Sequence, residues 1–108
     1  MDVQTRKLYR LKAQVIAAAG HPIRLAIIDF LRGGEQCVCD IARHVAAGRP
    51  NVSRHLAVLS RVGIVRSRKN GLRVLYSLCC PCVLKFTDCV AGVLKAQAKE
   101  ARSVLAGL

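Results

Sequence analysis

A chain of 108 residues is long enough for a domain with a small hydrophobic core, and we expect residues 1–108 to form a single domain. Hydrophobic residues make up 53% of the chain, which excludes a disordered protein, and no apolar run approaches the roughly 18–20 residues that span a membrane. The formal net charge of +12 favours a polyanionic partner. With two Tyr, two Phe and no Trp, the chain has few aromatic side chains that could stack on single-stranded bases. Double-stranded DNA is therefore the expected partner.

Six cysteines are the second unusual feature of the composition. The residues that follow Met1 contain no apolar core of a secretion signal, so we expect a cytoplasmic protein. Thiols stay reduced in that compartment. We therefore expect the cysteines to serve metal or redox chemistry rather than to form disulfides.

Apolar residues at helical spacing predict four helices in the first part of the chain. Glycines at 20, 33 and 34 are expected to end the first two, and Pro22 suits the first turn of the second. The helices are expected over about residues 5–19, 21–33, 37–46 and from a turn at 48–51 to about 62.

The periodicity changes after Gly63, where two β-type runs at 64–68 and 72–77 flank Lys69-Asn70-Gly71. Asn-Gly between such runs is a strong signal for a β-hairpin. From about Pro81 the pattern is helical to the end of the chain. This order predicts a mainly α protein with a small β-hairpin, a winged helix-turn-helix that dimerises through its first and last helices.

In a helix-turn-helix, the second helix enters the major groove and its N-terminal residues meet the base edges. Side chains that can hydrogen-bond to bases or phosphates gather at that end of the fourth predicted helix: Arg49, Asn51, Ser53, Arg54 and His55. The hairpin adds basic side chains suited to phosphates: Arg66, Arg68, Lys69 and Arg73. Together these residues are the predicted DNA-binding site.

Catalysis finds little support in the sequence. The six acidic residues include no pair whose spacing suggests general acid–base work, and no glycine-rich phosphate loop follows a strand. Cys37 or Cys39 with His44 can imitate a catalytic dyad. We nevertheless expect neither an enzyme nor a protein that binds a small organic substrate.

Several stretches of the chain resemble the ArsR/SmtB family of metal-sensing repressors, over about residues 8–95. They are His21-Pro22-Ile23-Arg24, Cys37-Val38-Cys39-Asp40-Ile41, Val52-Ser53-Arg54-His55-Leu56-Ala57-Val58-Leu59 and Gly63-Ile64-Val65. The Cys-Val-Cys-Asp stretch looks like the arsenical-responsive branch. The resemblance implies a homodimeric repressor that binds its operator without inducer and releases it when As(III) or Sb(III) binds cysteine thiolates.

Cys37 and Cys39 are the first candidates for such a site. They lie at a predicted helix N-terminus, where the pKa of a thiol falls. Side chains two residues apart on an ideal helix point about 200° apart, so chelation is expected to distort the start of this helix. The arsenical branch has a third cysteine three residues after the second. This chain has Ala42 there, so a third sulfur must come from elsewhere.

A second cluster, Cys79-Cys80-Pro81-Cys82 with Cys89, is the expected source of that sulfur. Cys82 and Cys89 are seven residues apart, which places them two turns apart on one helix face. Cys79 and Cys80 precede the helix and serve as alternates. Because cysteine also packs well as a small apolar residue, Cys89 in the core is the competing interpretation.

Three arrangements stay open at this point. Cys37 and Cys39 can join Cys82 or Cys89, within one protomer or across the dimer, and this joined site is the one we favour. Alternatively, the second cluster binds a metal by itself, or both clusters are sites. All three need deprotonated sulfur, so affinity should fall with acid.

Other functions compete with the arsenical sensor. Sulfur-rich sites also suit Cd(II), Pb(II), Hg(II) and Zn(II). The zinc-responsive branch places Asp, His and Glu ligands on its last helix, which has no histidine here, so a zinc site of that kind is not expected. A redox or persulfide sensor that pairs cysteines of separate helices, and a metal-buffering or architectural protein, are the remaining alternatives.

Overall fold

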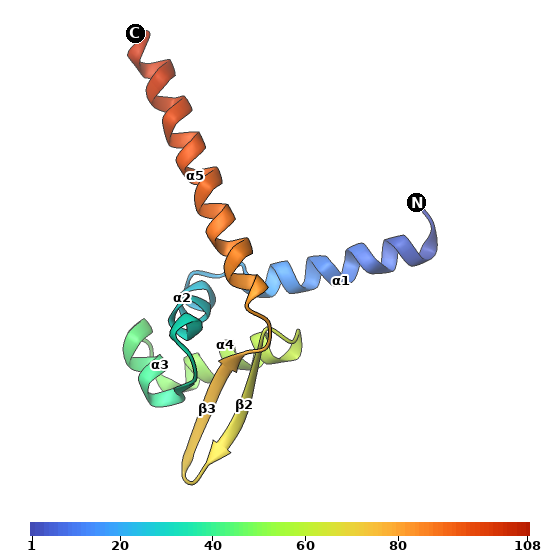
Figure 1. The fold of residues 1–108 in the computed structure, drawn as a ribbon, viewed down its shortest axis with the longest axis vertical. Coiled ribbons are helices and arrows are strands. Elements are labelled where there is room, and N and C mark those ends of the chain that lie inside the picture. The colour runs from blue at the N-terminus through green and yellow to red at the C-terminus, as the bar shows by residue number, and fades with distance from the viewer.

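The computed structural model describes residues 1–108, and its elements follow the predicted order (Figure 1). They are α1 (Val3–Ala19), α2 (Pro22–Phe30), a 3-10 turn η1 (Leu31–Gly33), β1 (Gln36–Cys37), α3 (Val38–Val45), α4 (Arg49–Arg61), β2 (Val65–Asn70), β3 (Arg73–Leu78) and α5 (Cys82–Ala106). The mainly helical winged helix-turn-helix is confirmed. The structure adds η1 and the short strand β1, which the sequence did not reveal.

The wing is a three-stranded antiparallel sheet in the order β1-β3-β2. β3 lies in the middle, so Leu75 is flanked by Cys37 on one side and Arg68 on the other. The hairpin turn lies one residue later than predicted. Asn70 pairs with Arg73, which leaves Gly71 and Leu72 as the two-residue loop. Gly71 has a φ of +65°, a conformation that glycine adopts without steric cost, and this requirement places the turn.

The helix-turn-helix also differs from prediction at one junction. The turn expected at residues 48–51 lies instead at residues 46–48, because α4 already begins at Arg49, with Gly48 as its N-cap. Pro50 fits there, since the first helical turn has no partner for the N–H group that proline lacks. Ala46 ends α3 in the left-handed conformation, with a φ of 53°.

The core lies among α2, α3, α4 and the start of β2. Its largest fully buried side chains are Ile27, Ile28, Ile41, Val52, Leu56 and Leu59. Burying each such side chain contributes about 1.5–3 kcal/mol to folding. By contrast, α5 has no buried residue and α1 has only Ala18 and Ala19.

The two terminal helices extend away from this core in different directions (Figure 1). Both carry large apolar side chains that are exposed in the single chain: Leu8, Leu11, Val15 and Ile16 on α1, and Phe86, Val90, Val93 and Leu94 on α5. A cavity of about 480 Å³ lies where α1, α2 and α5 meet, with Ile16, Leu25, Phe86 and Leu94 in its lining. These faces have no partner within the chain.

None of the helices is both long and apolar enough to cross a membrane by itself. Taken together, α1 and the α2–η1 segment reach the required length and composition, but they are bent by 86° at the break between them.

Candidate nucleic-acid interface and thiol clusters

The predicted recognition helix, α4, separates a buried face from a polar one. Val52, Leu56 and Leu59 are buried against the core. The predicted DNA-binding side chains in its first turns are exposed: Arg49, Asn51, Ser53 and Arg54. This arrangement leaves their donors and acceptors free for base edges and phosphates.

His55 is in a different position from these four residues, because it is half-buried and packs inside the protein. Its Nδ1 accepts a hydrogen bond of 3.1 Å from Nε of Arg24, and its ring centroid lies 4.4 Å from that of His21. Burial lowers the pKa of His55, and the nearby His21, Arg24 and Arg54 lower it further. A DNA contact through its remaining nitrogen stays a prediction.

Arg24 is a structural residue that the sequence interpretation missed. Its Nη1 donates to the backbone carbonyl of Ala18, 3.0 Å away, while its Nε binds His55 on α4. It therefore connects the end of α1 to the recognition helix. Arg24 belongs to the His21-Pro22-Ile23-Arg24 stretch that carries the family resemblance, but only the packing reveals its role.

The four basic residues predicted on the hairpin are all exposed, but they differ in their partners. Arg68 forms a bidentate ion pair with Glu35, with Nη2–Oε1 at 2.6 Å and Nε–Oε2 at 2.7 Å. This pair holds the pKa of Glu35 below its usual range, chiefly through the hydrogen bond from Arg68. Arg66 and Lys69 have no ion-pair partner in the chain.

Arg73 lies beside the first pair of cysteines. It occupies the position on β3 diagonal to Cys37, on the same face of the sheet. The pKa of Arg73 is raised by a hydrogen bond to Cys37 first, and by the charges of Cys37, Asp40 and Cys39. A residue predicted to bind phosphate thus lies beside a candidate metal ligand.

Cys37 and Cys39 occupy different environments. Cys37 ends β1 and is the N-cap of α3, with extended backbone (φ −80°, ψ 156°) and only 5% of its surface exposed. Cys39 lies in the first turn of α3 and is exposed. Because Cys37 is the N-cap and precedes α3, the 200° separation expected on an ideal helix does not apply to this pair. That chelation distorts the start of α3 stays a prediction.

The second cluster is exposed throughout: Cys79, Cys80, Cys82 and Cys89. Cys89 is not part of the core of the single chain, contrary to the competing interpretation. The sulfurs of Cys80 and Cys82 lie 2.6 Å apart. Their hydrogen bond lowers the pKa of Cys80 and raises that of Cys82.

The first cluster lies beside the middle of the central strand, and the second follows its C-terminal end. Cys37 is level with Leu75, and Cys79 follows the end of β3 at Leu78. Four residues of extended chain correspond to about 13 Å. No three His, Cys, Asp or Glu side chains come together within one chain in a way that could hold a metal ion. One protomer therefore does not bring Cys37 and Cys39 together with the thiols of α5.

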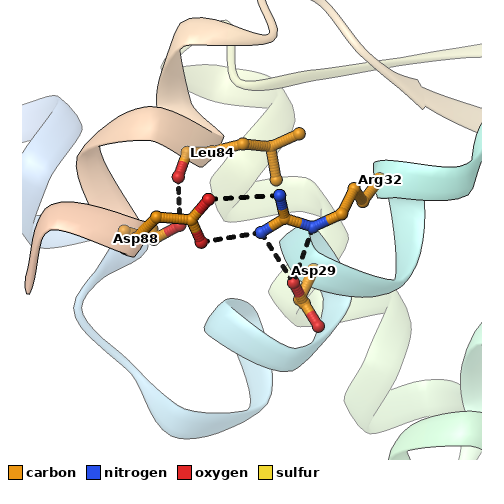
Figure 2. A network of polar contacts seen from close by, with 5 residues as sticks. Asp29, Arg32, Leu84 and Asp88 are labelled. Atoms are coloured by element: carbon orange, nitrogen blue, oxygen red, sulfur yellow. Dashed lines mark hydrogen bonds and ion pairs between the residues drawn. The ribbon is translucent and has the colours of Figure 1, made fainter. Parts of the chain in front are cut away.

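A polar network connects α5 to the core, next to Cys89 (Figure 2). Arg32 donates from Nη2 and Nη1 to the carboxylate of Asp88, at 2.8 and 3.2 Å, and from Nε to Asp29 at 3.1 Å. The hydrogen bond from Arg32 keeps the pKa of Asp88 below its usual range. The network positions the first turns of α5 against η1, and no local pattern in the sequence predicts it.

A polar-faced recognition helix followed by a basic hairpin defines a winged helix-turn-helix DNA-binding protein. The model of the family described as "Bacterial regulatory protein, arsR family" matches residues 21–67. The arsenical resistance operon repressor of Staphylococcus xylosus is 34% identical over 70 residues, 65% of this chain and 67% of that one. An HTH-type transcriptional regulator of Methanocaldococcus jannaschii is 39% identical over 64 residues, 58% of this chain and 72% of that one.

Solved structures agree with these relatives. The homodimeric winged helix-turn-helix domain of Mb0332 from Mycobacterium bovis, described as a possible ArsR-family regulator, has a TM-score of 0.80 at 26% identity and covers 93% of each chain. The chain belongs to the ArsR family. It is a DNA-binding transcriptional repressor of the ArsR/SmtB type and not an enzyme.

Proposed function

We propose that this chain acts in the cytoplasm as a homodimeric repressor that releases its operator when As(III) or Sb(III) binds cysteine thiolates. The observation that carries this proposal is the position of the thiols. Five of the six cysteines are exposed. Cys37 lies on β1 beside the middle of β3, the central strand of the wing, and the second cluster follows the end of β3. Trivalent arsenic favours thiolate ligands, and a ligand at either cluster would act on an element that adjoins the wing. The S. xylosus relative, named for arsenical resistance, supports the choice of ligand.

The dimer is proposed to form through α1 and α5. Their apolar side chains, exposed in the single chain, supply the surface that a partner would cover. The homodimeric state of the M. bovis domain supports a dimer. Two recognition helices would then reach successive major grooves, as dimeric helix-turn-helix proteins require.

The ligand set follows from the two clusters. We retain Cys37 and Cys39 with Cys82 or Cys89 as the joined site. Because one protomer keeps these groups apart, the joined site requires a thiol from the partner or a movement of α5. The alternative is a site in the second cluster alone, formed by Cys80 and Cys82 with Cys79 beside them. It needs no thiol from the partner and no movement of α5.

Fluorescence anisotropy with DNA from upstream of the chain's own gene tests the proposal. The reduced protein is titrated with arsenite, antimonite and cadmium under anaerobic conditions at fixed salt. We expect near-stoichiometric arsenite to release the DNA. Cys39→Ser should keep repression and lose the response if the joined site is correct. Cys82→Ser should lose it if the second cluster is the site or if the joined site uses Cys82, and Cys89→Ser should lose it if the joined site uses Cys89. An unchanged response in all three variants would remove these thiols from the site.

Other ligands are distinguished by the same titration. Release by cadmium alone would favour a sensor of soft divalent ions, with Pb(II), Hg(II) and Zn(II) tested next. DNA affinity that no ion alters would favour the metal-buffering or architectural alternative.

A thiol-based redox sensor is the second candidate, and the contact between the sulfurs of Cys80 and Cys82 favours it. Release by peroxide or polysulfide, with a cross-linked peptide seen by mass spectrometry, would support it over the metalloid sensor.

A further inference from the structure

An apolar cavity lies directly beside Cys80 and Cys82. It has a volume of about 250 Å³ and is formed by α1, the turn between α4 and β2, and the start of α5. Apart from the two cysteines, its main side chains are Val15, Ile16, Val62, Ile64, Val83 and Phe86. No charged side chain lines it.

Two thiols, and not three, belong to this cavity. The sulfurs of Cys80 and Cys82 are 2.6 Å apart, close enough for both to bind one soft atom. Cys79 is not part of the lining, and its backbone N–H donates to the carbonyl of Ile64 at 2.9 Å. The site therefore combines two thiols with room for an apolar group.

We infer that Cys80, Cys82 and this cavity bind a trivalent arsenical that carries one carbon substituent, R–As(OH)₂, with R in the cavity. Two As–S bonds form and two As–O bonds break, and each hydroxyl leaves as water with one thiol proton. Arsenic stays trivalent, so no oxidant or reductant is needed. The inference gives the ligand class of the proposed sensor, and rests on that function only for the link to DNA release.

The chemistry of the ligand matches the number of thiols. Inorganic trivalent arsenic has three bonds to exchange and favours three thiolates, whereas an arsenical with one carbon substituent has two. Transfer of that substituent from water to an apolar cavity adds affinity. An apolar protein cavity of roughly 150 Å³ holds benzene, so a cavity of about 250 Å³ accommodates a phenyl group.

Binding is measured with phenylarsonous acid and inorganic arsenite on the full-length reduced protein, in a Cys39→Ser background that removes the exposed thiol of the first cluster. We expect one phenylarsenic group per chain by intact mass, with loss of two titratable thiols. Peptide mapping should place it on residues 80 and 82. Phenylarsonous acid should bind about tenfold or more tighter than arsenite.

Matched variants separate the two thiols from their neighbours. Cys80→Ser and Cys82→Ser should each lose the tight adduct, whereas Cys79→Ser should keep it. Equal losses in all three variants, or an adduct mapped to other cysteines, would overturn the inference.

The cavity has its own test. Val62→Phe narrows it without replacing a thiol or a residue of the proposed dimer surface, and should reduce the preference for phenylarsonous acid over arsenite while arsenite binding is retained. A thermal unfolding transition like that of the parent protein shows that the variant is folded. An unchanged preference in a folded Val62→Phe protein would remove the cavity from the site.

DNA release is recorded separately. If the adduct forms on Cys80 and Cys82 and the DNA stays bound, the ligand class stands and the proposed sensing function fails. If DNA is released by arsenite and no adduct forms at these cysteines, the inference fails and the sensing function stands.

Discussion

Two side chains of the predicted DNA interface, His55 and Arg68, have partners inside the protein. Arg24 donates to Nδ1 of His55, and the Glu35 carboxylate accepts from Nε and Nη2 along one edge of the Arg68 guanidinium. A side chain that must give up such a partner to reach DNA contributes less affinity than its charge suggests. The DNA affinity of a basic side chain therefore depends on its partners within the protein as much as on its own charge.

Replacing Glu35 tests this point. In Glu35→Gln the Arg68 guanidinium loses its carboxylate partner and becomes available to phosphate. We expect tighter operator binding and a plot of log K against log salt that steepens by about 0.9 per new phosphate contact. Anisotropy over a range of salt concentrations measures both.

The control for this prediction is Asp29→Asn, which removes one negative charge away from the wing. If it increases the slope equally, net charge and not the release of Arg68 explains the effect. Adding Arg68→Ala to Glu35→Gln should abolish the gain.

The pH dependence of stability should reflect His55. Its pKa in the folded protein lies below the usual 6.5, so the unfolded chain binds more protons as the pH falls below that value. The free energy of unfolding should therefore decrease from pH 7 to pH 5. In His55→Gln, whose side-chain oxygen can still accept from Arg24, the decrease should be smaller. Urea unfolding across this range measures it, and equal pH dependence in both proteins would contradict the assignment.

At the scale of elements, the turns and contacts between helices fix how the helices are placed, which the periodicity of the sequence does not show. α3 ends at Ala46, a non-glycine residue in the left-handed region, and α4 begins three residues later. This compact turn sets the position of the recognition helix on the core. Arg32 performs a comparable task for α5, which it connects to η1 through Asp88 (Figure 2).

Ala46→Gly is expected to stabilise the protein by up to about 1 kcal/mol, because glycine adopts this conformation without the steric cost of a Cβ atom. Ala57→Gly is the matched control. It makes the same substitution at an exposed position inside α4 and should cost about 1 kcal/mol. Thermal unfolding of both variants is the measurement, and destabilisation by both would show that the turn carries no strain.

On the scale of the whole molecule, the chain has a compact DNA-binding unit and two helices, α1 and α5, that project from it (Figure 1). The unit formed by α2, α3, α4 and the wing buries nearly all of the core. α1 and α5 expose apolar faces that no other part of the single chain covers. The second thiol cluster lies where α5 joins this unit, which offers a route from a ligand at that cluster to the geometry of the dimer.

Leu94→Lys should weaken the proposed dimer by placing a charge on the apolar face of α5. Analytical ultracentrifugation should show a shift toward monomer, and operator affinity should fall because one recognition helix contacts one half-site. Leu72→Lys makes the same change at an exposed leucine in the hairpin turn and should leave the oligomeric state unchanged. Loss of the dimer in both variants, or in neither, would contradict the proposed surface.

The sequence by itself determined the order of elements, the winged helix-turn-helix and the polar face of α4. These features depend on periodicity and on glycine and proline positions, which act over a few residues and are therefore visible in the chain. It also placed the cysteines in two clusters.

Only the tertiary structure decided which of these residues are free and which are already bound. Glu35 and Arg68 are 33 residues apart, and Arg32 and Asp88 are 56 apart. Such pairs form only after packing brings distant segments together, so no local pattern indicates them. For the same reason the sequence missed β1, which pairs with β3, and with it the burial of Cys37 and the separation of the two thiol clusters along the strand.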